Sequence, residues 1–267
     1  MLDKARKWLS QQARTASRAL LAALVIGSAL LASVGTPATD AHRVKGLPSV
    51  VLWAWERRED LSFIDPRQIA VAYLARTLVL SGGRVILRPR FEPLTVPERT
   101  MLIPAARLEI DRLSPPLLSP AQRSEAARII AAMAVAVPPE IQVDFDATVT
   151  QRAFYRDLLA DVHDRLPPST ILSMTALASW CMGDDWLGEL PVDEIVPMLY
   201  RMGRDGPDIT SYLRGGRNFV SARARQSVGL STDEPVSGLA AGKRLYLFSA
   251  RRWTPIGLKR AILEASK

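Results

Sequence analysis

Eight short, nearly continuous apolar runs recur along this chain between helical or loop segments, and this alternation restricts the fold more than any other feature. The runs span residues 50–55, 70–75, 102–110, 141–146, 171–178, 194–200, 226–232 and 244–249. Strands that are buried on both faces show such continuous apolar runs, which are typical of a parallel sheet covered by helices. Eight strand–helix units in one domain predict an α/β fold that closes into a (β/α)8 TIM-type barrel.

The predicted barrel is irregular because its connections differ in kind. Ser119, Thr150 and Thr254 are each placed to cap the start of a helix, and proline follows Ser119 and Thr254. Between the second and third strands, residues 77–80 and 84–88 flank Ser81-Gly82-Gly83. This pattern predicts a β-hairpin inserted after strand two. The connections after strands one and seven are short, so we expect little helix there.

The first 38 residues have the composition of an export leader. Five Lys or Arg and one Asp precede an uncharged stretch over residues 19–39, which ends near Thr36-Pro37-Ala38. The length suits either a cleaved signal peptide or an uncleaved N-terminal membrane anchor. In both cases we expect residues 39–48 to form a linker and 49–267 a single barrel domain. That domain would be exported, either periplasmic or anchored in the inner membrane facing the periplasm, with membrane contact only through its N-terminal segment.

Charge and composition exclude several function classes. The net charge is +8, but residues 39–267 hold 30 Lys and Arg against 26 Asp and Glu, and no basic stripe is present, so we expect no nucleic-acid partner. Two histidines exclude a Ser-His-Asp triad and any metal site with several histidines. Ser81-Gly82-Gly83 lacks the phosphate-loop pattern. We therefore expect no metal or cofactor, and a buried, apolar role for the single cysteine, Cys181.

Acids, arginines and aromatic residues gather where the predicted strands end, which is where active sites of such barrels lie. Among the acids, Asp144, Asp146, Glu109 and Glu234 are the candidate catalytic residues. The candidate substrate-binding residues are Glu56, Trp55, Trp180, Asp184, Tyr200, Arg201 and Trp253. An indole face can carry the C–H face of a sugar ring. Each tryptophan could equally fill the core, so only the set favours a carbohydrate ligand.

The fourth strand is the most informative. Alternation places Gln142, Asp144 and Asp146 on one face and apolar residues on the other, so the two aspartates should point into the barrel. Two like charges in a partly dry cavity raise one pKa, as general acid catalysis requires. The alternative is that both aspartates pair with an inward arginine such as Arg107 in a buried network.

Two segments resemble the chitinase-type glycoside hydrolases. Residues 141–148, Ile-Gln-Val-Asp-Phe-Asp-Ala-Thr, are similar to their fourth-strand motif DxxDxDxE, and Met198-Leu-Tyr200-Arg201 is similar to their sixth-strand motif MxYD. Trp253 occupies the place of the tryptophan that floors their sugar site. The resemblance implies that Asp144 and Asp146 support the substrate's acetamido group and that Tyr200 assists.

The chain departs from that family at two positions. Thr148 stands where the family has its general-acid glutamate, and Arg201 where it has the sixth-strand aspartate, so the family mechanism does not transfer intact. An acid would have to come from Glu109, Glu56, Asp184 or Glu234. Over most of its exported part the chain also resembles a bacterial family of unknown function, through residues 51–60, 142–155 and 175–202.

Three hypotheses follow. The first is a glycoside hydrolase-like envelope protein that acts on a polysaccharide or glycan strand through carboxylates at the strand ends. The second is a catalytically inactive barrel that binds a glycan or a protein partner, favoured by Thr148 and Arg201. The third is a structural envelope protein without a ligand, which requires all charges at the strand ends to be paired. The sequence does not identify the sugar, the linkage or the oligomeric state.

Overall fold

The computed structural model describes residues 43–136, 139–183 and 185–267. The predicted leader and Asp184 lie outside these residues. In the described part, no helix has both the length and the apolar character needed to cross a membrane.

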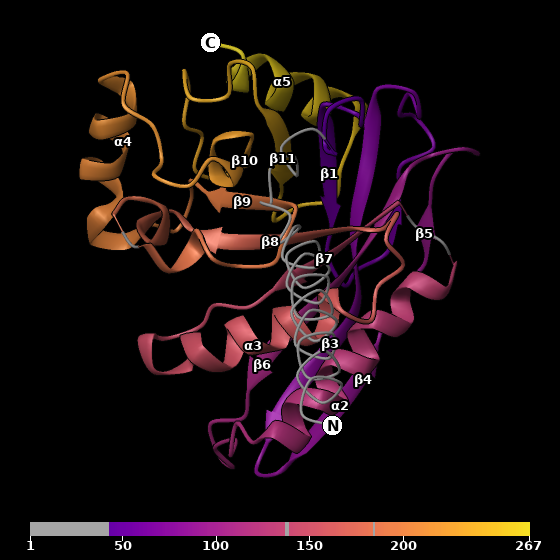
Figure 1. Cartoon of the computed structure of the whole chain (residues 1–267). Helices are drawn as coiled ribbons and strands as arrows, with labels where there is room; N and C mark the ends of the chain where they lie inside the picture. The colour runs from indigo at the N-terminus through magenta and orange to yellow at the C-terminus, as the bar shows by residue number, and fades with distance from the viewer. Residues whose placement is uncertain (1–42, 137–138, 184) are drawn as a thin grey trace, which may run out of the picture. The chain divides into compact units, whose positions relative to one another are not determined.

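Eight parallel strands close into a barrel, as predicted. In spatial order they are β1 (Val50–Ala54), β11 (Arg244–Phe248), β10 (Ser227–Ser231), β9 (Glu194–Met198), β8 (Ile171–Leu177), β7 (Glu140–Asp144), β6 (Leu102–Ile110) and β3 (Ile69–Ser81). Pairing of β1 with both β3 and β11 closes the ring (Figure 1). All eight predicted runs are therefore strands. Two short strands, β2 (Glu59–Asp60) and β5 (Leu94–Thr95), pair outside the ring.

The predicted hairpin after strand two is present, but it is continuous with the barrel. β3 runs for 13 residues and turns back at Gly82-Gly83 into the antiparallel strand β4 (Arg84–Pro89). The sequence predicted a strand that ends at Ala75. Instead, the register with β6 shifts between Leu74 and Arg76, so this irregularity lets one strand serve both the barrel and the hairpin.

Four α-helices accompany the described strands: α2 (Pro120–Ala131), α3 (Arg152–His163), α4 (Gly206–Arg214) and α5 (Pro255–Ala265). Ser119 and Thr254 cap α2 and α5, as predicted, by accepting backbone N–H bonds from Gln122 and Gly257. The predicted cap at Thr150 is wrong. The turn that leads into α3 begins at Thr148, whose backbone N–H is bound by the Gln151 side chain. The reason is a short 3-10 turn, Val149–Gln151, which starts before the helix proper.

Two apolar layers lie on either side of the strands. The outer layer packs the outward residues of the strands, including Ile141, Val143 and Phe145, against the helices. The barrel-interior cluster consists of Val51, Trp53, Ala70, Ala72, Ile103, Ala105, Val196, Tyr246 and Phe248. Its alanines come from β3 and β6 and make room for the aromatic side chains of β1 and β11. The interior beside β7 and β8 is polar instead, with Gln142, Ser173 and Thr175 fully buried or nearly so.

A buried ionic network lies at the amino ends of the strands. Arg244 contacts Glu140 at 2.8 Å and Glu194 at 3.1 Å, and the Tyr246 hydroxyl bonds to both carboxylates. Burial, and then the charge of Glu194, raises the pKa of Glu140 to about 8. Glu140 is therefore protonated at neutral pH, and one arginine suffices for the two acids. This network is at the opposite end of the barrel from the predicted site.

Candidate functional site

Asp144, the last residue of β7, is fixed on both of its oxygens. Its Oδ2 accepts from Arg107 Nη1 of β6 at 2.5 Å, and its Oδ1 accepts from Thr175 Oγ1 of β8 at 2.7 Å. The strand register explains these contacts, because Arg107 is the β6 partner of Asp144. Only 3% of Asp144 is exposed. It points into the barrel as predicted, but it serves as a buried, paired carboxylate.

Asp146 lies two residues further on, beyond the end of the strand, and is held much more loosely. Its side chain is 51% exposed, and its contact with Arg107 Nη2 measures 3.6 Å, beyond hydrogen-bond distance. Partial burial, and then the charge of Asp144, raises the pKa of Asp146, while Arg107 and Arg201 oppose this effect. Asp146 is thus an accessible acid whose proton is retained to higher pH than usual.

Arg107 is the centre of the site. Besides the two aspartates, it contacts Glu109 at 3.4 Å, and its guanidinium lies over the Trp55 ring at 5.5 Å from the centroid. Three of the predicted residues, Asp144, Asp146 and Glu109, therefore meet on one cation, with Trp55 beside it. The predicted alternative, an ionic network around Arg107, is present, but it saturates only Asp144.

An aromatic group lies inside the barrel below Trp55. Trp53 packs against Trp55 edge to face and stacks on Phe248. The ring centroids of Phe248 and Tyr200 are 4.9 Å apart. Burial, and then the charges of Asp144 and Asp146, raises the pKa of Tyr200 well above its ordinary value. Tyr200 is therefore a neutral hydroxyl close to the aspartates at neutral pH.

Arg201 and Glu234 are joined through the backbone. The N–H of Arg201 donates to Glu234 Oε2 at 2.7 Å, and Arg201 has a positive φ of 51°. Such a φ is strained for a residue with a side chain, so the bond to Glu234 helps to hold this turn after β9. Glu56 is exposed after β1, and Asp184 lies outside the described residues.

Two of the predicted sugar platforms are placed in the core instead. Trp180 is 5% exposed and packs edge to face on Trp186, at 5.1 Å, in the outer apolar layer. Trp253 is also 5% exposed, and its indole N–H donates to the Trp53 carbonyl. Neither offers an open ring face in this structure. Trp55 is the predicted tryptophan that the structure brings to the carboxylates.

Thr175 and Arg90 are parts of the site that the sequence pattern did not predict. Thr175 could have been found by alternation, since Ser173 and Thr175 lie on the inward face of β8. Arg90 donates to the carbonyls of Trp55 and Arg57 and so fixes the segment after β1. Nothing in the sequence signals this, because the contact joins the residue after β4 to a loop more than thirty residues earlier. In the described chain, no group of three His, Cys, Asp or Glu has the arrangement of a metal site.

Comparisons with known proteins give only slight likenesses. No family model and no curated protein matches the sequence. Among solved structures, the Bacillus cereus spore cortex-lytic enzyme SleL is 17% identical, with a TM-score of 0.40, over 69% of this chain and 51% of that one. The chitinase domain of the spore coat protein CotE from Clostridium difficile is 14% identical, with a TM-score of 0.39, over 62% of this chain and 54% of that one. The matches span about half the length of those chains. The closed barrel is established by this chain's own strand pairings.

Proposed function

We propose that the carboxyl end of the barrel is the glycan site of a glycoside hydrolase-like protein. The observation that carries the proposal is Asp146, an accessible carboxyl group whose pKa is raised by its surroundings. A carboxylic acid with a raised pKa can protonate a departing glycosidic oxygen, so we assign to Asp146 the acid role that the sequence left to other carboxyl groups. Trp55 supplies an aromatic surface beside it, on which a sugar ring can rest.

Hydrolysis needs a second carboxylate, and Glu109 is the better placed of the two candidates. Asp146 and Glu109 contact the same guanidinium, so their nearest oxygens lie no more than about 10 Å apart. Pairs of carboxyl groups that flank a scissile bond are roughly 5–9.5 Å apart, depending on stereochemical outcome. Glu234 is the alternative, held against the backbone of Arg201. Asp144 is excluded from direct chemistry, because both of its oxygens are occupied.

The ligand that we propose is a polysaccharide or glycan strand of the cell envelope. The composition of the first 38 residues supports a location outside the cytoplasm, periplasmic or facing the periplasm from the inner membrane. The two solved structures above are named as a cortex-lytic enzyme and a chitinase domain. Their likeness is too slight to identify the sugar.

The proposal is tested by assaying the full chain for new reducing ends released from a panel of envelope and extracellular glycans. Asp146→Asn is assayed alongside and should abolish release, because a carboxamide cannot act as a general acid. Asp164→Asn is the matched control, since that side chain is 79% exposed at the end of α3 and should leave release unchanged. Release that persists in Asp146→Asn would show that another group is the acid.

A second candidate function is glycan binding without hydrolysis. Arg107 favours it, because one cation holds the acids of the site together, and Thr148 favours it, because it begins the turn into α3 in place of an acid. This candidate predicts that no glycan is cleaved but that at least one binds, measurably by calorimetry. Trp55→Ala should weaken that binding, because it removes the half-buried ring beside Arg107. Cleavage that is lost in Asp146→Asn would rule the candidate out.

A further inference from the structure

The helical covering of the barrel is interrupted beside β10. The chain leads from β10 to β11 through residues 232–243, which contain no helix. Elsewhere, helices such as α2 and α3 cover the outward side chains of the strands. Here the loop supplies Leu239, which lines a hollow together with the outward residue Val228 of β10. A pocket is therefore left on the outer side of the barrel, where a regular barrel has the helix that follows its seventh strand.

This pocket has an apolar wall built from several segments. Leu199 follows β9, Leu213 is on α4, and Phe219 is on the segment after α4; with Val228 and Leu239 they form the wall. The hollow has a cavity volume of roughly 170 Å³, and roughly 540 Å³ when the open space at its mouth is included. Gly216 and Gly238, with φ of 78° and 81°, make turns at its edge, and open space surrounds both.

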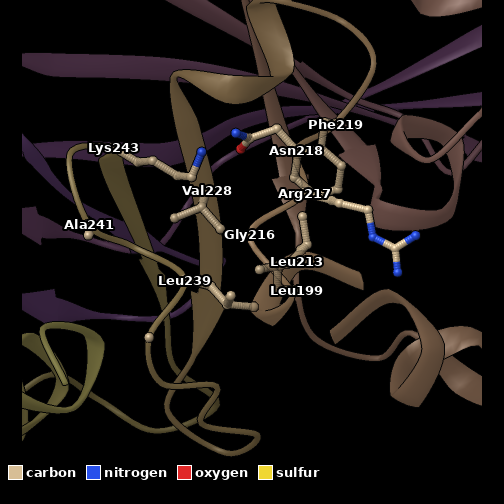
Figure 2. A pocket seen from close by; sticks show the side chains of 11 residues that line it. Leu199, Leu213, Gly216, Arg217, Asn218, Phe219, Val228, Leu239, Ala241 and Lys243 are labelled. Carbon is tan, nitrogen blue, oxygen red and sulfur yellow. The ribbon is translucent and has the colours of Figure 1, made fainter. Parts of the chain in front are cut away.

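The charged side chains that line the pocket are both cationic. Lys243 and Arg217 line it, and none of its lining residues is acidic. Figure 2 shows the Lys243 ammonium and the Asn218 amide toward the upper end of the pocket and Leu199, Leu213 and Leu239 toward the lower end. The Arg217 guanidinium points away from the other side chains (Figure 2) and lies over the Tyr212 ring at 4.3 Å. Lys243 is thus the cation available to a ligand.

Lys243 lacks a counter-charge. Its ammonium donates to the Arg225 carbonyl at 2.6 Å, and within the described residues no carboxylate lies within ion-pair distance of it. Partial burial, and then the charge of Arg225, lowers the pKa of Lys243. A bound anion would restore the electrostatic partner that this site lacks, and the remaining ammonium hydrogens are available to it.

We propose that this pocket binds an apolar molecule with a single anionic end, either a carboxylate or a phosphate. Lys243 and Asn218 hold the anionic end, and the leucines and Phe219 contact the apolar part. This pocket is separate from the proposed glycan site at the carboxyl end of the strands. The proposal of an anionic ligand does not depend on the function proposed there.

The test is photo-labelling of the full chain with a decanoate that carries a diazirine on its alkyl chain. After irradiation, the labelled peptides are mapped by mass spectrometry. We expect label on the peptides that contain Leu199, Leu213 or Leu239, and competition by excess decanoate. Decyl phosphate as competitor distinguishes the two headgroups, since the better competitor identifies the preferred anion. The same diazirine probe ending in an alcohol should label these peptides about tenfold less.

Two variants test the role of charge. Lys243→Met keeps the aliphatic stem and should reduce labelling about tenfold at subsaturating probe. Asn218→Asp adds a carboxylate at the polar end of the pocket and should also reduce labelling about tenfold. It tests the preference for an anion at a second position, while Lys243 is left in place. Lys259→Met is the matched control on the exposed surface of α5 and should leave labelling unchanged. Label elsewhere on the chain, equal labelling by acid and alcohol, or unchanged labelling in both pocket variants would overturn the proposal.

Discussion

At the scale of single residues, the site depends on how one arginine is shared. Arg107 neutralises the buried Asp144 and leaves Asp146 with a long contact of 3.6 Å. Two aspartates of one motif thereby acquire different properties. Asp144 is a buried carboxyl group held by Arg107 and Thr175, while Asp146 is an accessible acid with a raised pKa.

Replacing Arg107 should destabilise the folded protein, because Asp144 would lose its arginine partner. We expect Arg107→Met to lower the free energy of unfolding at neutral pH by about 3–5 kcal/mol, because it leaves the buried Asp144 carboxyl group without its arginine partner. Urea denaturation measures this. The double variant Arg107→Met/Asp144→Asn should recover part of the loss. Arg67→Met, in a pair whose arginine is 87% exposed, is the control and should change stability by less than about 0.5 kcal/mol.

Part of this site could be predicted from the sequence. The inward direction of Asp144 follows from alternation along a strand whose other face is apolar, and the structure agrees. Which aspartate is paired could not be predicted, since it depends on the register between β6 and β7. Trp180 and Trp253 show a second limit. A tryptophan after a strand can turn into the outer apolar layer as easily as into the site, and its neighbours along the chain do not decide between them.

At the scale of elements, the strands were the most predictable parts. Each is buried on both faces, so its apolar run is continuous and its length is clear. The extension of β3 into the hairpin was missed, because a single register shift at Ala75 has no signature in composition. The start of α3 was misplaced by two residues, because Thr148 and Thr150 are equally good caps in sequence.

The cap of the last helix can be tested directly. Thr254 Oγ1 accepts from the Gly257 N–H at 3.1 Å, and the first turn of α5 has no acidic residue to assist it. Thr254→Ala should therefore lower the free energy of unfolding by about 1 kcal/mol. Thr254→Ser retains the hydroxyl and should lose much less stability. Thermal unfolding of the parent protein and both variants measures the difference. Equal losses would show that the methyl group matters rather than the hydrogen bond.

Strand β10 offers a test of packing inside the barrel. A Cβ atom on Gly229 would lie 3.2 Å from a ring carbon of Phe248 and 3.5 Å from the Met198 Cα. Gly229→Ala should thus cost about 1–3 kcal/mol through overpacking. Gly183→Ala has open space around the added carbon and should be nearly neutral. Comparable denaturation midpoints for the two variants would contradict the prediction.

At the scale of the whole molecule, the network at the amino ends makes stability depend on pH. Glu140 faces Glu194, Arg244 and Tyr246, and its pKa in the folded protein is about 8. In the unfolded chain it ionises near its ordinary value, about 4.3. The folded state therefore holds one proton more than the unfolded state between these values.

The sign of the effect follows from that proton. As pH rises from about 5 to about 8, the free energy of unfolding should fall by on the order of a few kcal/mol and then level off. Glu140→Gln mimics the protonated acid and should flatten the profile. Glu98→Gln, at an exposed position, should keep the slope of the parent protein. The measurement is denaturant unfolding at a series of pH values, and a parent profile that is flat or rises with pH would refute the assignment.

The ring of strands also has a temporal consequence. β1 pairs with β11 in a register that joins Val50 to Leu245, so the earliest strand of the ring meets one of the latest elements of the chain. During synthesis, one edge of β1 stays open until nearly the whole chain has emerged. Contacts this distant in sequence slow folding and leave incomplete chains with unpaired edges. Until β11 has been synthesised, the open edge of β1 must be protected from pairing with other chains.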